Sequence, residues 1–480
     1  MGRDVLKTGT YVDGFLIGEK LHVGGMASLW RVTRDDINFP IVLKTPLILD
    51  GDDATAIVGF EMEQMILPQL TGPHSPRCVA VGDFSRQPYL VMEYVEGSSL
   101  LPEFEKSPLP IDRVRDIGAR VATALDALHR QHVIHLDIKP SNIILRKTGE
   151  AALIDFGLSR HEQLPDLLAE EFRLPMGTGP YISPEQVRGL RSNPRSDLFS
   201  LGVLLYHLAT GERPFGFPNS RRGLRTRLWR DPVPPRAIRP EIPEWMQEII
   251  LRCLEVDPNK RHPTAAQLAF DLTHTEDVRI TERGRRTERD PLLTALKRRW
   301  KTPFGPTAPA TQMADQISSA PIVAVCVDLE ASVVLTTALR DTVARILQAM
   351  PGARLACLNI LRLNRLAINY ALDAEGQNVH VSRLVELKEW ARPLQRHDAQ
   401  TTFHVLEAPD VAGALADYAR ANRVDQIVIG ARGSSTVRRF LGSVSSRVVA
   451  EAPCTVTVVR APAQPGQGDG LEELAAAEQP

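Results

Sequence analysis

The chain has 480 residues, a length that predicts two or three domains rather than one core. Its 43% hydrophobic and 24% charged residues are an ordinary globular mixture, and a formal net charge of -1 argues against nucleic acid or an acidic membrane as a partner. The five scattered cysteines indicate a reducing compartment, and neither a signal peptide nor an apolar stretch of membrane-spanning length is recognisable, so we expect a cytoplasmic protein without a transmembrane segment.

The first region, residues 11–275, places strand patterns before helix patterns. Strand-like runs occur at Phe15–Val32, Ile41–Pro46 and Tyr89–Tyr94, and helix-like patterns follow at Ile111–Arg130 and Trp245–Leu254. This order predicts a small β-rich lobe over about residues 11–95 and a larger α-rich lobe over about residues 96–275.

Two further regions and a tail follow. Residues 276–319 crowd arginine and lysine and then proline and alanine, which predicts a flexible linker with a short basic helix at Pro291–Trp300. Residues 320–462 alternate helical stretches with short β-rich runs at Ile322–Val327, Arg354–Ile360, Thr401–Leu406, Gln426–Ile429 and Thr455–Val459. That alternation predicts a parallel sheet covered by helices on both faces, and residues 463–480 have the composition of a disordered tail.

A phosphoryl-transfer constellation stands in the α-rich lobe. His135-Leu136-Asp137-Ile138-Lys139-Pro140-Ser141-Asn142 is followed by Asp155-Phe156-Gly157 after an apolar run. Transfer of phosphate from ATP needs a carboxylate that orients the attacking hydroxyl, oxygen ligands for Mg²⁺ and a cation on the phosphates. Asp137 supplies the first, and Asn142 and Asp155 supply the metal ligands. Lys139 lies close enough in sequence to Asp137 to neutralise the migrating phosphoryl group.

These motifs resemble the eukaryotic-like (Hanks-type) protein kinases found widely in bacteria, over about residues 11–275. The resemblance implies the bilobal α+β protein-kinase fold, with ATP and Mg²⁺ or Mn²⁺ as cofactors. It assigns Lys44 to the phosphates, Glu63 to the partner of that lysine, Val23, Gly24 and Gly25 to the glycine-rich loop, and the backbone of Glu93 and Val95, beside the gatekeeper Met92, to adenine. It also assigns Thr178, Glu185, Asp197, Gly202 and Arg261 to the end of the activation segment and its support.

This sequence departs from the family pattern at three places. His22 and Ala27 stand where the family has the first and third glycines of the loop, so we expect looser contact with the phosphates. Val42 replaces a small alanine in the adenine pocket and should tighten it. Leu136 stands where many members have the arginine that meets a phosphorylated activation segment.

The activation segment, which lies between Gly157 and Gly177, lacks the phosphate acceptor that such an arginine would bind. It has no hydroxyl between Ser159 and Thr178, so we expect a kinase that does not depend on activation-loop phosphorylation, with acids such as Glu170 and Glu171 in place of the phosphate. In the family, lysine at the position of Lys139 marks kinases that act on serine and threonine, and Thr178 is placed to contact it.

The last region resembles the universal stress protein family, whose members have a Rossmann-like α/β parallel sheet. The resemblance lies in a buried strand that runs into Gly430-Ala431-Arg432-Gly433, followed by a spacer and Gly442-Ser443. We expect Gly430, Gly433, Gly442 and Ser443 to cradle the phosphates of ATP, with Asp328 on the ribose or adenine. The spacer is one residue shorter than the usual form, and the alternative is that the glycines serve only tight turns. The final strand resembles the family's dimer edge, so a homodimer is a further expectation.

Two functions remain open from the sequence. The first is a serine/threonine protein kinase that phosphorylates protein substrates, tuned by a stress-related nucleotide domain. The second is a pseudokinase scaffold that binds nucleotide without catalysis. The presence of Lys44, Glu63, Asp137, Asn142 and Asp155 favours the enzyme, and His22 favours the scaffold slightly.

Overall fold

Residues 1–318 and 319–480 form separate units in the computed structural model of the chain. The structure describes residues 6–24, 27–46, 54–84, 88–172, 174–218, 220–288, 320–362, 378–394, 400–431 and 443–461. Several predicted features lie outside these residues: Gly25, Gly433, Gly442, the helix at Pro291–Trp300 and the tail 463–480.

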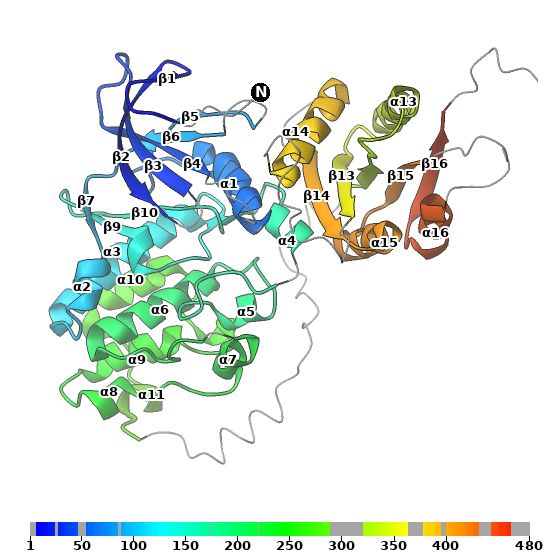
Figure 1. The fold of residues 1–480 in the computed structure, drawn as a ribbon. Coiled ribbons are helices and arrows are strands. Elements are labelled where there is room, and N and C mark those ends of the chain that lie inside the picture. Colours follow the sequence, from blue (N-terminus) through cyan, green and yellow to red (C-terminus); the bar gives the residue numbers. More distant parts are fainter. Residues whose placement is uncertain are drawn as a thin grey trace, which may run out of the picture. The chain divides into compact units, whose positions relative to one another are not determined.

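The first unit starts with an antiparallel sheet of spatial order β1-β2-β3-β4-β6-β5 (Figure 1). Its strands are β1 (Tyr11–Val12), β2 (Phe15–Val23), β3 (Ala27–Thr33), β4 (Ile41–Pro46), β5 (Cys78–Val81) and β6 (Leu90–Glu93). Alternate residues of β2 and β3 point into one core, so Phe15, Ile17, Trp30 and Val32 are buried together, as a two-residue period requires. Helix α1 (Ala54–Ile66) contacts β4 and carries Glu63.

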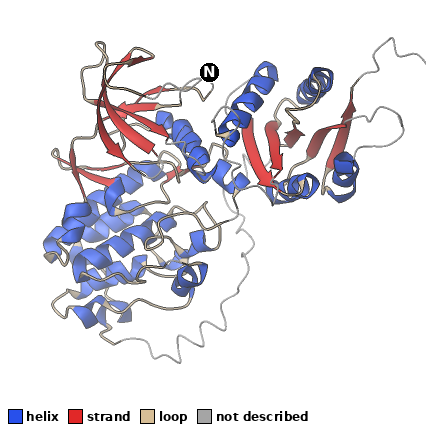
Figure 2. Cartoon of the chain, in the orientation of Figure 1, coloured by secondary structure: helices blue, strands red, loops and turns tan. Residues whose placement is uncertain are grey.

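The second half of this unit is helical, and Figure 2 shows its helices gathered apart from the strands of the first sheet. Helix α3 (Ile111–His129) buries Val114, Ile117, Val121 and Leu125, an i, i+3, i+4 stripe. Helix α6 (Arg195–Thr210) is buried over most of its surface and ends at Gly211, whose φ of 76° is the left-handed conformation that glycine adopts most easily.

The remaining elements of the unit are short apart from two helices. They are α2 (Leu101–Glu105), α4 (Leu167–Glu171), α5 (Pro184–Val187), α7 (Arg221–Arg225), α8 (Pro235–Ile238), α9 (Glu244–Cys253), α10 (Ala265–Thr273) and α11 (Glu282–Arg285), with β7 (Gly97–Ser99), β8 (Val133–Ile134), β9 (Ile143–Arg146), β10 (Ala151–Leu153) and β11 (Arg160–His161). The predicted strands at 41–46 and 89–94 and the predicted helices at 111–130 and 245–254 are confirmed within one or two residues. The predicted run at Phe15–Val32 is two strands, β2 and β3, which pair with each other.

The start of the predicted linker is packed, which corrects the expectation that residues from 276 onwards are flexible. Helix α11 contacts α9, where the carboxylate of Glu248 accepts hydrogen bonds from Thr281 N at 3.0 Å and Gly284 N at 2.8 Å. Arg283 pairs with the same carboxylate at 2.5 Å. The basic segment therefore continues the helical half of the first unit at least to residue 288.

The second unit is a parallel sheet of spatial order β14-β13-β12-β15-β16 (Figure 1). Its strands are β12 (Ile322–Cys326), β13 (Arg354–Arg362), β14 (Thr401–Ala408), β15 (Gln426–Ala431) and β16 (Thr455–Arg460), and all five predicted strands are confirmed. Helices α13 (Val333–Ala349) and α14 (Val379–Ala391) pack on one face, and α15 (Val411–Asn422) and α16 (Ser443–Glu451) pack on the other. Each face has its own apolar core, as the predicted doubly covered sheet requires.

Candidate active site

Lys44, Glu63 and Asp155 form one cluster, although they come from a strand, a helix and a loop. Lys44 Nζ lies 2.5 Å from Glu63 Oε2 and 2.9 Å from Asp155 Oδ1. Glu63 Oε1 also accepts from the backbone N–H of Phe156 at 3.3 Å, so α1 is tied directly to the segment that carries Asp155. The Glu63 side chain is 1% exposed and that of Asp155 is 43% exposed, which leaves Asp155 accessible to a ligand.

The charges in this cluster reinforce each other. Burial acts to lower the pKa of Lys44, but the carboxylates of Asp155 and Glu63 outweigh it and raise that pKa. The ammonium group of Lys44 in turn lowers the pKa of Asp155 to about 2, against the effect of burial. Burial raises the pKa of Glu63, and the charge of Lys44 opposes that shift. At neutral pH the cluster therefore presents a cation suited to phosphate beside an ionised carboxylate suited to a metal ion.

Asp137 is the centre of a second cluster. Its Oδ1 accepts from Thr178 Oγ1 at 2.7 Å and from Thr178 N at 3.2 Å. Its Oδ2 accepts from Lys139 Nζ at 2.6 Å and from Asn142 Nδ2 at 3.1 Å. Lys139 Nζ also donates to Thr178 Oγ1 at 3.3 Å. These bonds fix the orientation of a carboxylate that is 5% exposed.

A β-hairpin joins the two clusters. Asn142 directly precedes β9, Asp155 follows β10, and the two strands pair antiparallel, with Ile143 opposite Leu153. The backbone N–H of Ile154 also donates to Asn142 O at 3.0 Å. Both predicted metal ligands therefore lie at the same end of one hairpin, where an amide oxygen and a carboxylate fit a hard cation such as Mg²⁺.

Asp197 supports the loop that carries Asp137. It is fully buried in α6, and its carboxylate accepts from His135 N at 2.9 Å and Leu136 N at 2.8 Å, with His129 Nε2 at 2.9 Å. Leu136 and Asp155 have φ values of 62° and 68°, a conformation that residues with side chains rarely adopt. The buried carboxylate of Asp197 stabilises the loop at His135 and Leu136, in agreement with the resemblance that assigned Asp197.

The pair assigned at the end of the activation segment is formed as well. Arg261 Nη1 and Nη2 lie 2.7 and 2.8 Å from the two oxygens of Glu185, and both side chains are buried. Gln186, the next residue, was not singled out from the sequence. Its Nε2 donates to Leu136 O at 2.8 Å and to Met176 O at 3.0 Å, and so ties the activation segment to the catalytic loop. The capping box that Gln186 forms with Ser183 is the sequence signal that could have drawn attention to it.

The residues predicted to hold the rest of a nucleotide lie on other strands. Val23 ends β2 and is 54% exposed, and the N–H of Gly24 donates to Ala27 O at 2.9 Å, which closes the turn between β2 and β3. The Glu93 side chain pairs with Arg146 at 2.7 Å, and its N–H donates to Arg77 O at 2.9 Å. The carbonyl group of Glu93 and the backbone groups of the half-buried Val95 are the hydrogen-bonding groups that this segment could offer to adenine.

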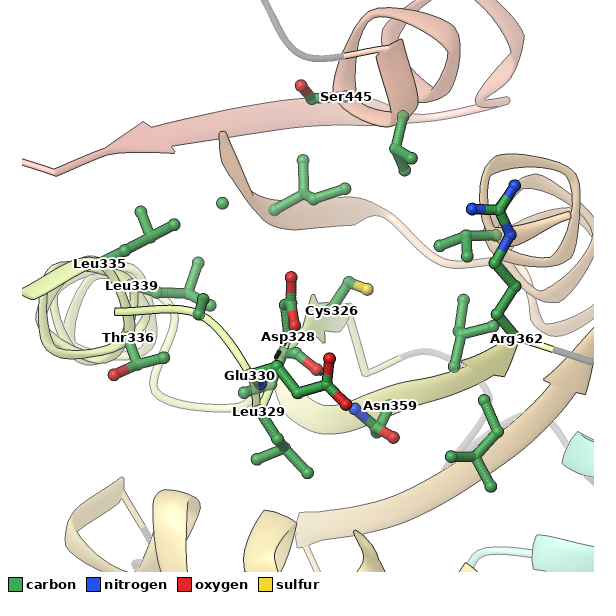
Figure 3. Close-up of a pocket in the computed structure, with 18 of the residues that line it drawn as sticks. Cys326, Asp328, Leu329, Glu330, Leu335, Thr336, Leu339, Asn359, Arg362 and Ser445 are labelled. Atoms are coloured by element: carbon green, nitrogen blue, oxygen red, sulfur yellow. Dashed lines mark hydrogen bonds between the residues drawn. The ribbon is translucent and has the colours of Figure 1, made fainter. Parts of the chain in front are cut away.

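In the second unit, Asp328, Gly430 and Ser443 line one cavity of about 620 Å³. Figure 3 shows Asp328 among the residues of this cavity. The cavity lies beyond the carboxyl ends of β12 and β15, which are neighbours although one is the first strand of the sheet and the other the fourth. This reversal of strand order is where open α/β sheets bind ligands. Asp328 Oδ1 accepts from Glu330 N at 3.2 Å, the contact drawn in Figure 3.

No described helix is long and apolar enough to span a bilayer.

Comparison with known protein families agrees with both units. The protein kinase domain model matches residues 16–271, and the universal stress protein family model matches residues 321–460.

Among relatives, a probable serine/threonine-protein kinase of Clostridium perfringens is 29% identical over 275 residues, which are 57% of this chain and 40% of that protein. The serine/threonine-protein kinase PknL of Mycobacterium tuberculosis is 30% identical over 271 residues, 56% of this chain and 67% of that protein. The solved kinase domain of PknI from the same organism aligns with a TM-score of 0.45 at 22% identity, over 56% of this chain and 99% of that one.

The match to the kinase model runs over more than half of the chain. It includes Lys44, Glu63, Asp137, Asn142 and Asp155, the residues that the structure gathers into the two clusters. The chain therefore belongs to the protein kinase family and carries a universal stress protein domain after its kinase domain.

Proposed function

We propose that this chain is a serine/threonine protein kinase that transfers the γ-phosphate of ATP to hydroxyl groups of protein substrates. The observation that carries the proposal is the second cluster, in which Asp137 is oriented by Lys139, Asn142 and Thr178. A substrate hydroxyl within hydrogen-bonding reach of Asp137 would be aimed at the phosphate, and the carboxylate would accept its proton. The bond between Lys139 and Thr178 supports serine and threonine, rather than tyrosine, as the acceptors.

The other residues bind and orient ATP. Lys44, held charged by Glu63 and Asp155, would contact the phosphates, and Lys139 would offset charge on the transferred group. Asn142 and Asp155 would hold Mg²⁺ or Mn²⁺, which neutralises charge on the β- and γ-phosphates. The transfer forms a bond from the substrate oxygen to the γ-phosphorus and breaks the bond from that phosphorus to the β–γ bridging oxygen, so ADP leaves.

The pseudokinase scaffold is the second candidate, and the turn between β2 and β3 favours it. His22 is exposed near the end of β2, just before this turn, and the N–H of Gly24 donates to Ala27 O. A loop with weak phosphate contacts lowers ATP affinity, but it leaves the clusters around Lys44 and Asp137 complete. The geometry therefore supports the enzyme better.

We also propose that activity does not depend on phosphate in the activation segment. Thr178 is the first hydroxyl-bearing residue after Ser159, and its hydroxyl is bonded to Asp137 and Lys139. Ser159 is fully buried, and its hydroxyl donates to His135 O at 3.0 Å. Phosphate on either residue would disrupt the site instead of ordering it.

Phosphatase-treated full-length protein, incubated with γ-labelled ATP, Mg²⁺ and a generic basic protein, is expected to label serine and threonine of the substrate, and EDTA is expected to stop the reaction. Peptide mapping of the active protein should find no phosphate on residues 158–178. The Asp137→Asn variant controls for contaminating kinases. Nucleotide binding without labelling would support the scaffold, and activity that appears only after phosphate enters Thr178 would contradict phosphate-independent activation.

We propose a second ATP site in the cavity of the universal stress protein domain, in a setting of stress signalling that the family match supports. Titration calorimetry of the full chain is expected to find two nucleotide sites, and Asp328→Ala with Ser443→Ala is expected to leave one. Asp341→Ala, at an exposed carboxylate of the same unit, is the control and should keep two. Two sites in the double variant would contradict this placement.

We also propose a homodimer that forms through β16, and a cytoplasmic location for the protein. The order of strands makes β16 an edge of its sheet, and an edge strand can pair with a second copy. Sedimentation velocity of the full chain measures this directly, and a monomer at micromolar concentration would contradict the dimer.

A further inference from the structure

One guanidinium group outside the activation segment binds it at two separate points. Arg191 lies between α5 and α6 and is 8% exposed. Its Nε donates to the two carboxylate oxygens of Asp166 at 3.2 and 2.9 Å. Its Nη2 donates to Leu158 O at 3.1 Å and to Ser159 O at 3.3 Å. A single side chain therefore connects the start of the segment to its middle.

The acceptor at the middle of the segment is a carboxylate between two arginines. Besides Arg191, Arg160 Nε lies 3.8 Å from Asp166 Oδ2, and the Asp166 side chain is only 12% exposed. Arginine pairs of this kind bind phosphate groups in proteins, because several N–H donors converge on one dianion. Here the carboxylate of Asp166 stands where a phosphate group would bind between the two arginines. We expected Glu170 or Glu171 to replace the phosphate, whereas the acid bonded to Arg191 is Asp166.

Asp166 also determines where α4 begins. Its Oδ1 accepts from Ala169 N at 3.2 Å, a helix N-cap, and α4 buries Leu167 and Leu168. Helix α4 contacts α1, the helix that carries Glu63. A Cβ atom on Gly59 of α1 would lie 3.0 Å from Gly157 O, so α1 is also packed closely on the start of the segment. The position of the segment therefore constrains the pair between Glu63 and Lys44.

We propose that Arg191 and Asp166 form a permanent latch, an ion pair that holds the activation segment and, through α4 and α1, the Glu63–Lys44 pair in place without phosphate. Both are positioning residues, since neither touches the reacting atoms. The proposal rests on the proposed kinase activity and assigns the contact that makes its activation independent of phosphate. The arginine missing at position 136 is thus replaced by one from a different part of the chain.

The substitutions are chosen so that the effect of losing the ion pair can be told apart from the loss of the α4 N-cap and from a general loss of stability. Asp166→Asn keeps an oxygen for Ala169 N, because asparagine caps helices as well as aspartate does. It removes the charge and replaces the other acceptor of Arg191 with an amide donor, so it weakens the ion pair and leaves the cap. Arg191→Lys keeps the charge and loses the paired donors, whereas Arg191→Met removes both. Arg252→Met is a control for the loss of an arginine elsewhere in the same unit, because the more exposed Arg252 pairs with Asp271 at 3.5 Å in the contact between α9 and α10.

In the full chain, with Mg²⁺ and a generic basic protein, Asp166→Asn and Arg191→Met are each expected to lower kcat at least about tenfold and to change KM for ATP less than about threefold. Arg191→Lys should retain more activity than Arg191→Met. The double variant should lose little more than either single one, because the two residues act as one pair. Amide hydrogen exchange should rise in residues 54–66 and 158–172 in the variants and stay unchanged in Arg252→Met.

An unchanged kcat in Asp166→Asn and Arg191→Met overturns the latch, and so does an equal loss in Arg252→Met, which would show a general effect on stability. If the wild type shows no transfer that depends on Asp137, the proposed function fails, and the exchange measurement still decides the latch. Unchanged protection of residues 158–172 in both variants would then overturn it.

Discussion

Replacing Asp137 with asparagine is expected to lower kcat for phosphate transfer by about 10²–10⁴-fold and to change ATP affinity less than about twofold. Asparagine has the shape of aspartate, but one of its two terminal groups is a donor. That amide would face Lys139 Nζ or Thr178 Oγ1, which donate to the carboxylate at 2.6 and 2.7 Å. The variant therefore loses the proton acceptor and opposes one donor with another, while Lys44 and the metal ligands stay in place.

The measurement is steady-state transfer at saturating ATP beside equilibrium binding of a fluorescent nucleotide. Asp126→Asn is the control, since Asp126 pairs with Arg130 at 2.7 Å on the same lobe and touches neither cluster. Equal rates for wild type and Asp137→Asn would reject the enzyme and leave the scaffold. A rate that falls in step with nucleotide binding would instead assign Asp137 to ATP binding and not to the chemical step.

The sequence predicted the elements of both units well because their signals are local. A two-residue period marks β2 and β3, and continuous apolar runs mark the buried strands of the parallel sheet. The contacts of Lys44, Glu63 and Asp155 could also be anticipated, but only through family resemblance. Nothing local relates residues that are 111 positions apart, as Lys44 and Asp155 are.

The two main differences between prediction and structure concern charged residues. Residues 276–288 have the composition of a solvated linker, and Arg191 lies in a short segment without a motif. Composition cannot tell an arginine that faces water from one that pairs with a buried acid, because the partner is fixed only by the tertiary fold. Arg283 finds Glu248 on α9, and Arg191 finds Asp166. Paired charges of this kind are the part of a fold that sequence patterns leave open.

Breaking the pair between Glu185 and Arg261 is expected to cause a large loss of stability in the kinase unit. The Arg261 side chain is 0% exposed and that of Glu185 is 4% exposed. Arg261 also donates to Arg195 O at 2.7 Å and Glu255 O at 2.8 Å. Glu185→Gln leaves this guanidinium without a counter-charge in a dry environment, which costs about 3–5 kcal/mol in free energy of unfolding, and lowers the melting temperature by roughly 10 °C.

Scanning calorimetry of the full chain measures the effect, and the transition of the universal stress protein domain, which lacks the mutation, is its internal reference. Arg252→Met is the control, because its pair is 35% exposed on the arginine side and should contribute less than about 1 kcal/mol. The double variant Glu185→Gln with Arg261→Met should recover part of the loss, since it removes the unpaired cation together with its partner. A loss below about 1 kcal/mol in Glu185→Gln would show that the carbonyl oxygens around Arg261 are enough to hold its charge.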